Sequence, residues 1–171
     1  MLTGFAVSGH PIIRAAKVKK IEDTLLPNEA SGTPKQRTIH ILHGLGGTGK
    51  TQPAIAYARK HQNTNGAVVW VYGNSKNTVL QSLAEFGRQA GISNATKPMS
   101  STAQQVPDLE AETRAVMPWL GLERNRQWLM IFDNVDRDLQ SAEEDGQLFD
   151  VASFLPAADH GFILIMSRLS S

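Results

Sequence analysis

One glycine-rich segment constrains this chain more than any other part of it. Residues 44–51 read Gly-Leu-Gly-Gly-Thr-Gly-Lys-Thr and satisfy every position of the pattern GxxxxGK[ST]. A β-rich run over residues 38–43 precedes the segment, and an alanine-rich helical pattern over residues 50–61 follows it. A strand, a glycine-rich loop and a helix in this order are typical of a loop that wraps a phosphate group. A chance glycine turn is the alternative, and this context disfavours it.

The residue types of the loop indicate what it binds. Glycine lets the backbone bend around an anion without Cβ clashes, and successive N–H groups at a helix N-terminus attract negative charge. We therefore expect Lys50 to reach the β- and γ-phosphates of a nucleotide and Thr51 to take a ligand position on Mg²⁺. The loop residues expected to bind the nucleotide are Gly44, Gly46, Gly47, Thr48, Gly49, Lys50 and Thr51.

The remaining pattern predicts an α/β fold. Short apolar runs over residues 38–43, 67–72, 128–132 and 162–166 alternate with helical patterns over residues 12–26, 50–61, 78–90 and 109–122. Pro118 is expected to kink or split the last of these helices. Strands that alternate with helices indicate βαβ units and a parallel sheet. The last two runs are continuously apolar, as expected for strands covered on both faces. We expect a three-layer αβα sandwich of the P-loop NTPase type with a mainly parallel sheet.

Composition narrows the classes of function. A length of 171 residues suits one domain, and 41% apolar with 19% charged residues is ordinary for a folded protein. The net charge of +1 argues against binding nucleic acid or a membrane surface through charge alone. With no cysteine, disulfides and thiolate metal sites are excluded. We expect a cytoplasmic protein, with an N-terminal helix and linker over residues 1–36 and the nucleotide-binding core over residues 37–171.

A second candidate site follows the third apolar run. Asp133 comes directly after residues 128–132, which places a carboxylate at the C-terminal tip of a buried strand, where open α/β sheets bind ligands. In a chain with a complete phosphate loop, Asp133 is expected to hold Mg²⁺ through water, opposite Thr51. Asp136 lies three residues further on and has two interpretations: it orients the water that attacks the γ-phosphate, or it only caps the following turn.

The fourth apolar run is followed by Ser167 and Arg168. An arginine at the end of a buried strand can reach the γ-phosphate and so distinguish ATP from ADP. An ordinary surface arginine is the alternative, and the residues alone leave both interpretations open. The expected catalytic residues are therefore Lys50, Asp136 and Arg168, and the expected metal ligands are Thr51 and Asp133.

Taken together, these motifs resemble the NB-ARC domain, the nucleotide-binding module of the STAND class of signal-transducing NTPases. The resemblance is to the fungal NB-ARC proteins that carry TPR repeats, and it covers nearly the whole chain. It rests on residues 43–60, 128–136, 155–156 and 161–169, which occur in the family's order and spacing.

The resemblance implies a set of roles. It makes Lys50 and Thr51 the Walker A pair, Asp133 the Walker B residue and Arg168 the sensor arginine, and it extends the nucleotide-binding residues to Gln52. The implied cofactors are ATP or ADP with Mg²⁺, and the implied partners are another copy of this chain or full-length NB-ARC proteins.

The chain also departs from the family pattern. Asn134 stands where many members have a second acidic residue, the expected general base, so hydrolysis is expected to be slow or absent. His10 stands where an arginine is usual in the family's N-terminal segment that packs on adenine, and an extra residue breaks the spacing of that segment. We also expect truncation after the fourth core strand, because the family continues into a fifth strand and a helical subdomain. Without a fifth strand, residues 38–43 would form an exposed edge of the sheet.

Three functions follow from these observations. The first is a nucleotide-dependent switch that hydrolyses ATP slowly, and the second is an ADP-binding or interaction module without turnover, or a gene fragment of a longer NB-ARC or NACHT protein. The third is a small-molecule kinase, which the lack of an arginine-rich lid in the sequence disfavours.

Overall fold

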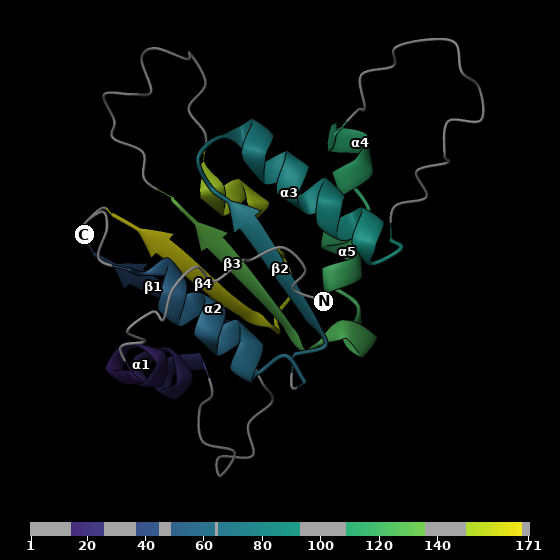
Figure 1. Cartoon of the computed structure of the whole chain (residues 1–171). Coiled ribbons are helices and arrows are strands. Elements are labelled where there is room, and N and C mark those ends of the chain that lie inside the picture. The colour runs from purple at the N-terminus through teal and green to yellow at the C-terminus, as the bar shows by residue number, and fades with distance from the viewer. Residues whose placement is uncertain are drawn as a thin grey trace.

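The computed structural model of the chain describes residues 15–25, 37–44, 49–63, 65–92, 109–135 and 150–168. These residues form a parallel sheet with helices on both of its faces (Figure 1). The strands are β1 (Thr38–His43), β2 (Ala67–Tyr72), β3 (Trp128–Asp133) and β4 (Phe162–Ser167). The helices are α1 (Ala15–Leu25), α2 (Thr51–Lys60), α3 (Lys76–Gln89), α4 (Leu109–Thr113) and α5 (Val116–Leu120), with 3₁₀ turns at Glu123–Asn125 and Val151–Phe154.

The strands lie in the order β1-β4-β3-β2, and each neighbouring pair is parallel. The predicted α/β class with a mainly parallel sheet is therefore confirmed. β3 and β4 occupy the centre, and all six residues of β3 are buried. Their continuous apolar sequence follows from this position, since a central strand has helices packed on both faces.

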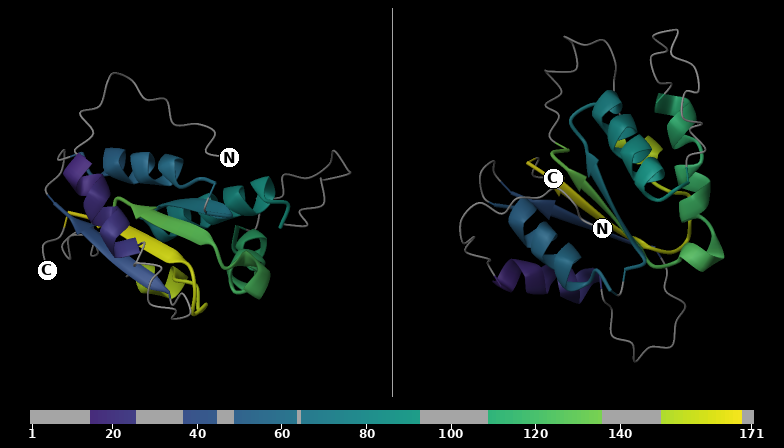
Figure 2. Two further views of the ribbon diagram at one scale, coloured as in Figure 1. Left: turned by 90° about the horizontal axis from the view of Figure 1, so that it is seen from below. Right: turned by 45° about the vertical axis from the view of Figure 1, so that its right-hand side comes forward.

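Alternate residues of the strands enter two separate cores. On one face, Leu129 and Ile131 of β3 pack with residues of α1 and α2. On the other face, Met130 and Phe132 pack with residues of α3 and α5. Helices α1 and α2 thus cover one face of the sheet, while α3 and α5 cover the other (Figure 2).

Local signals fix the helix ends. Ser75 caps α3, because its hydroxyl accepts from the Thr78 N–H while the Thr78 hydroxyl accepts from the Ser75 N–H. The helix expected over residues 109–122 is split, but the break falls at residues 114–115 rather than at Pro118. Pro118 is the third residue of α5, where a proline is tolerated because the first turn has no use for its N–H.

Within the described residues, β1 has a neighbouring strand on one side only. The side chains of Ile39 and Ile41 are 40% and 47% exposed, which is high for isoleucine in a sheet. Thr38 and Gly44 donate their N–H groups toward β4. Because backbone groups alternate in direction along a strand, the N–H and C=O groups of Ile39 and Ile41 point away from β4. The expectation that this strand forms an edge is confirmed for the described sheet.

An ionic cluster joins α1 to α2. The Glu22 carboxylate accepts from Lys60 Nζ at 2.7 Å and lies 3.1 Å from His61 Nε2. These hydrogen bonds, the one from Lys60 first, hold the pKa of the Glu22 carboxyl below its usual value of 4.5. The cluster holds α1 against the sheet beside its buried residues Ile21 and Leu25.

The turn before β4 supplies a test of packing. Gly161 has a positive φ of 88°, and a Cβ added there would overlap the Trp128 indole. Trp128 is fully buried and donates its Nε1–H to the Leu120 carbonyl at 2.9 Å. We expect Gly161→Ala to lower the free energy of unfolding by about 3 kcal/mol, through backbone strain and overpacking, measured by urea denaturation.

Gly91 offers a matched control. It also has a positive φ, 65°, but a Cβ added there meets nothing within 4 Å. Gly91→Ala should therefore cost only the backbone strain, about 1 kcal/mol. Equal losses in the two variants would contradict the packing argument.

Acid titration tests the cluster between α1 and α2. Since the folded pKa of Glu22 is depressed, its contribution to stability is present above the unfolded pKa and is lost as the pH falls below 4.5 through the folded pKa. We expect Glu22→Gln to lower the free energy of unfolding by about 1 kcal/mol at pH 7. Urea unfolding should show the stabilities of wild type and variant converging as the pH falls below 4.5, and a constant difference would count against the cluster.

Candidate nucleotide-binding site

The two ends of the glycine-rich loop lie between β1 and α2. Gly44 follows β1 and donates its N–H to the Ser167 carbonyl at 3.3 Å. Gly49 adopts a positive φ of 70°, a conformation that glycine reaches without a steric penalty. Lys50 then leads into α2 with helical backbone angles. Residues 45–48, and with them Gly46, Gly47 and Thr48, lie outside the described residues.

Lys50 turns back across the start of the loop. Its Nζ donates to the Gly44 carbonyl, so the ammonium lies beside the loop backbone rather than out in solvent. Thr51 and Gln52 occupy the first turn of α2, and Pro53 follows as the third residue of the helix. A missing N–H costs little in a first turn, so Pro53 leaves the anion-binding end of α2 intact.

The hydroxyl of Thr51 faces the carboxylate of Asp133. Its Oγ1 lies 3.4 Å from both Asp133 Oδ1 and Oδ2, longer than the usual distance of a hydroxyl–carboxylate hydrogen bond. Asp133 is only 5% exposed, at the C-terminal tip of β3. A hydroxyl and a carboxylate are hard oxygen donors of the kind that Mg²⁺ prefers. These two residues therefore fit a magnesium site.

Tyr72 is a neighbour of Asp133 that the sequence analysis did not single out. The parallel register pairs the two residues, and the Gly73 N–H donates to the Asp133 carbonyl at 2.7 Å. Burial, and then the charge of Asp133, raise the pKa of the Tyr72 phenol. The signal that could have found Tyr72 is its place at the end of the second apolar run, because the ends of parallel strands meet at one edge.

The segment after β3 is tied to the end of β4. Asn134 has a positive φ of 59°, which asparagine tolerates better than most residues. Val135 donates its N–H to the Met166 carbonyl at 3.0 Å, and its own carbonyl accepts from the Ser167 hydroxyl at 3.0 Å. Ser167 is thus a second residue of this edge that sequence reasoning did not assign a role. Asp136 lies outside the described residues.

Arg168 follows β4 at the same edge of the sheet. Ser167, the residue before it, pairs with His43 of β1, which directly precedes the loop residue Gly44. The sheet therefore brings Arg168 to the side where Gly44, Thr51 and Asp133 lie. His10, and the N-terminal segment expected near adenine, lie outside the described residues.

Comparisons with known proteins bear on the fold. No protein-family model matches the chain, and no curated protein sequence matches it. Among solved structures, the crystal structure of Cdc6p from Pyrobaculum aerophilum matches with a TM-score of 0.51 and 16% sequence identity. The match covers 96% of this chain but 41% of that one, so this chain spans about two fifths of its length. At this identity the likeness shows the fold, an α/β sheet of the P-loop NTPase type.

The helices themselves add one finding. Within the ranges that the structure describes, no helix is both long enough and apolar enough to cross a lipid bilayer.

Proposed function

We propose that this chain is the nucleotide-binding P-loop part of a STAND-type NTPase of the NB-ARC kind, and that it binds ADP or ATP with Mg²⁺. The observation that carries the proposal is the approach of Thr51 to Asp133 at the C-terminal ends of the strands. These residues come from the two separate motifs that the sequence singles out. In the sheet, β4 lies between β1, which precedes the loop and Thr51, and β3, which ends at Asp133.

The residues of the site have distinct tasks in this proposal. The N–H groups of the loop and of the first turn of α2 bind the phosphates. Lys50, which donates to the Gly44 carbonyl, exchanges that contact for the β- and γ-phosphate oxygens. Thr51 and Asp133 hold Mg²⁺, which when bound neutralises phosphate charge. Gln52 and the remaining loop residues complete the phosphate contacts.

We propose further that the domain acts as a switch with slow or absent hydrolysis. Asn134, the residue that directly follows Asp133, carries an amide, which cannot accept a proton as a carboxylate does. Asp136 is then the remaining candidate to orient the attacking water, and Arg168 the residue that distinguishes ATP from ADP. In this proposal the bound nucleotide sets the conformation of the domain, and turnover resets it.

A passive ADP-binding module is the second candidate function. Asn134 favours this function as well. It stands where many NB-ARC members have an acidic residue, and its left-handed backbone conformation suits an asparagine. A turnover assay separates the two. Phosphate release above background by the wild-type chain, lost in Asp136→Asn, supports the switch, whereas binding without release supports the passive module.

Substitution of the loop lysine tests nucleotide binding directly. We expect Lys50→Ala to weaken ADP and ATP binding at least about tenfold, or ~1.4 kcal/mol, because a charge-assisted contact to phosphate is lost. The measurement is calorimetric titration of the purified chain, after any co-purified nucleotide has been released and identified by chromatography.

Lys19→Ala is the matched control. Lys19 lies on α1 in an exposed pair with Asp23 at 3.5 Å, so its loss removes the same charge without touching the loop. Equal affinities in all three proteins, or no binding by a folded wild type, would refute the proposal.

The metal-binding pair has its own test. We expect Thr51→Val and Asp133→Asn to abolish the difference between nucleotide affinities measured with Mg²⁺ and with a chelator, because the first removes the hydroxyl donor and the second removes the negative charge of the carboxylate. Thr51→Ser retains the hydroxyl and should keep most of the Mg²⁺ dependence. A Mg²⁺ dependence that survives in both Thr51→Val and Asp133→Asn would place the metal elsewhere.

A further inference from the structure

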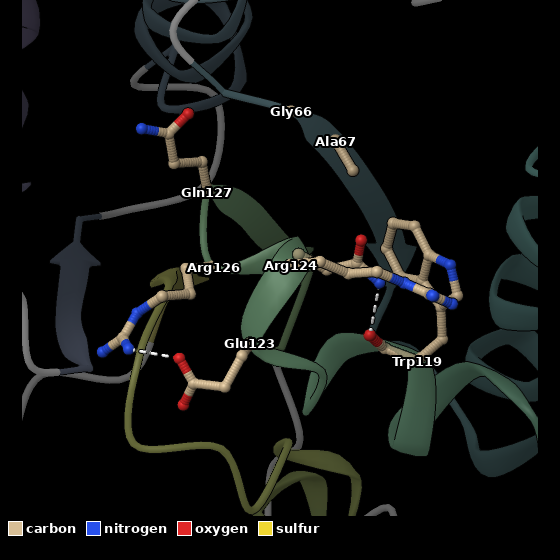
Figure 3. A pocket seen from close by; sticks show the side chains of 8 residues that line it. Gly66, Ala67, Trp119, Glu123, Arg124, Arg126 and Gln127 are labelled. Carbon is tan, nitrogen blue, oxygen red and sulfur yellow. Dashed lines mark hydrogen bonds and ion pairs between the residues drawn. The ribbon is translucent and has the colours of Figure 1, made fainter.

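A pocket lies at the end of the sheet opposite the candidate nucleotide site. It has a volume of about 440 Å³ and opens beside Ala67, where β2 begins, and Gln127, directly before β3 (Figure 3). Thr51 and Asp133 contact each other at the other ends of the strands. A ligand in this pocket would therefore be separated from the phosphate loop by the length of the sheet.

The walls of this pocket are held in place by hydrogen bonds and ring packing. Asn125 donates its side-chain amide to the Trp119 carbonyl at 2.8 Å, and Ala67 donates its N–H to the Gln127 carbonyl at 3.2 Å. The Trp119 ring meets the Phe86 ring edge-on, with their centroids 5.7 Å apart. Because these contacts need no ligand, the pocket is pre-formed, as small-molecule sites usually are.

One arginine of the pocket, Arg124, takes part in no ion pair among the residues that the structure describes. Glu123 pairs with Arg126 at 2.5 Å. Nearby, the contact with His160, and then the charge of Arg126, lower the pKa of the Asp159 carboxyl, so both carboxylates already have cationic neighbours. Arg124 is exposed and has no carboxylate partner among the residues that the structure describes. Among the described residues, the Arg124 guanidinium is therefore the cationic group of the pocket lining that has no carboxylate within ion-pair distance.

We propose that this pocket binds a planar organic anion, a carboxylate carried on an aromatic or heteroaromatic ring. Arg124 supplies a fork of N–H donors that matches a carboxylate. The half-buried Trp119 indole, which lines the pocket with Arg124 (Figure 3), supplies an apolar face for the ring. The volume lies within the range of about 300–1,000 Å³ typical of small-molecule sites.

Naphthalene-2-carboxylate serves as the probe, with the neutral naphthalene-2-carboxamide as its counterpart. Titrations are followed in ¹H–¹⁵N spectra, where the Trp119 indole N–H reports on the pocket. We expect the carboxylate to shift this signal saturably at millimolar concentrations. The carboxamide should bind at least about fivefold more weakly, since it lacks the charge that pairs with Arg124.

Two variants test the assignment. Arg124→Gln should weaken the carboxylate at least about fivefold and leave the carboxamide unchanged. Arg114→Gln, which removes an exposed arginine beside α4 and outside the pocket lining, should leave both probes unchanged. Equal carboxylate affinity in wild type and Arg124→Gln, or no saturable shift in a folded wild type, would overturn the proposal.

A competition experiment separates this site from the nucleotide site. Saturating ADP with Mg²⁺, and the Lys50→Ala substitution, should leave naphthalene-2-carboxylate binding unchanged. If either abolishes it, the probe occupies the phosphate loop and the second site is refuted. Because the readout is the Trp119 signal, failure of nucleotide binding and failure of this proposal are distinguishable.

Discussion

The placement of β4 between β1 and β3 is the constraint on which the candidate site depends. β4 pairs with both neighbours in parallel register, so the segments that follow β1 and β3 emerge at the same edge. Two backbone hydrogen bonds then fix these segments to β4, one from Gly44 to the Ser167 carbonyl and one from Val135 to the Met166 carbonyl. Without this intervening strand, Thr51 and Asp133 would have no fixed relation to each other.

Sequence reasoning succeeded where a local pattern carries the information. The four apolar runs became strands with starts as expected and ends within one residue. For β3 and β4 the reason is that burial on both faces demands a continuous apolar sequence. The break near Pro118 was misplaced, since a proline does not reveal by itself whether it lies inside a helix or in its first turn. Tyr72 was missed because its contact with Asp133 depends on how β2 and β3 pair, and local sequence patterns do not reveal this register.

The fold and the chemistry have different support. The likeness to Cdc6p, at 16% identity, reaches the architecture of the sheet and its helices, and one architecture hosts many functions. The case for a nucleotide therefore rests on particular atoms: a lysine that folds onto its own loop, and a hydroxyl that faces a buried carboxylate. Asn134 belongs to the same edge, and its left-handed backbone gives it a structural reason to be there apart from any effect on hydrolysis.

The exposed flank of β1 has a consequence for handling the protein. Ile39 and Ile41 present both apolar side chains and outward-pointing backbone groups within the described sheet, a combination that recruits strands of other chains. Within the described sheet, this exposed flank is separate from the buried contacts of β1, which lie toward β4 and α1. A polar, β-branched replacement such as Ile41→Thr removes exposed apolar surface while keeping a residue type that suits a strand. Such a replacement raises solubility with little change in the stability of the fold.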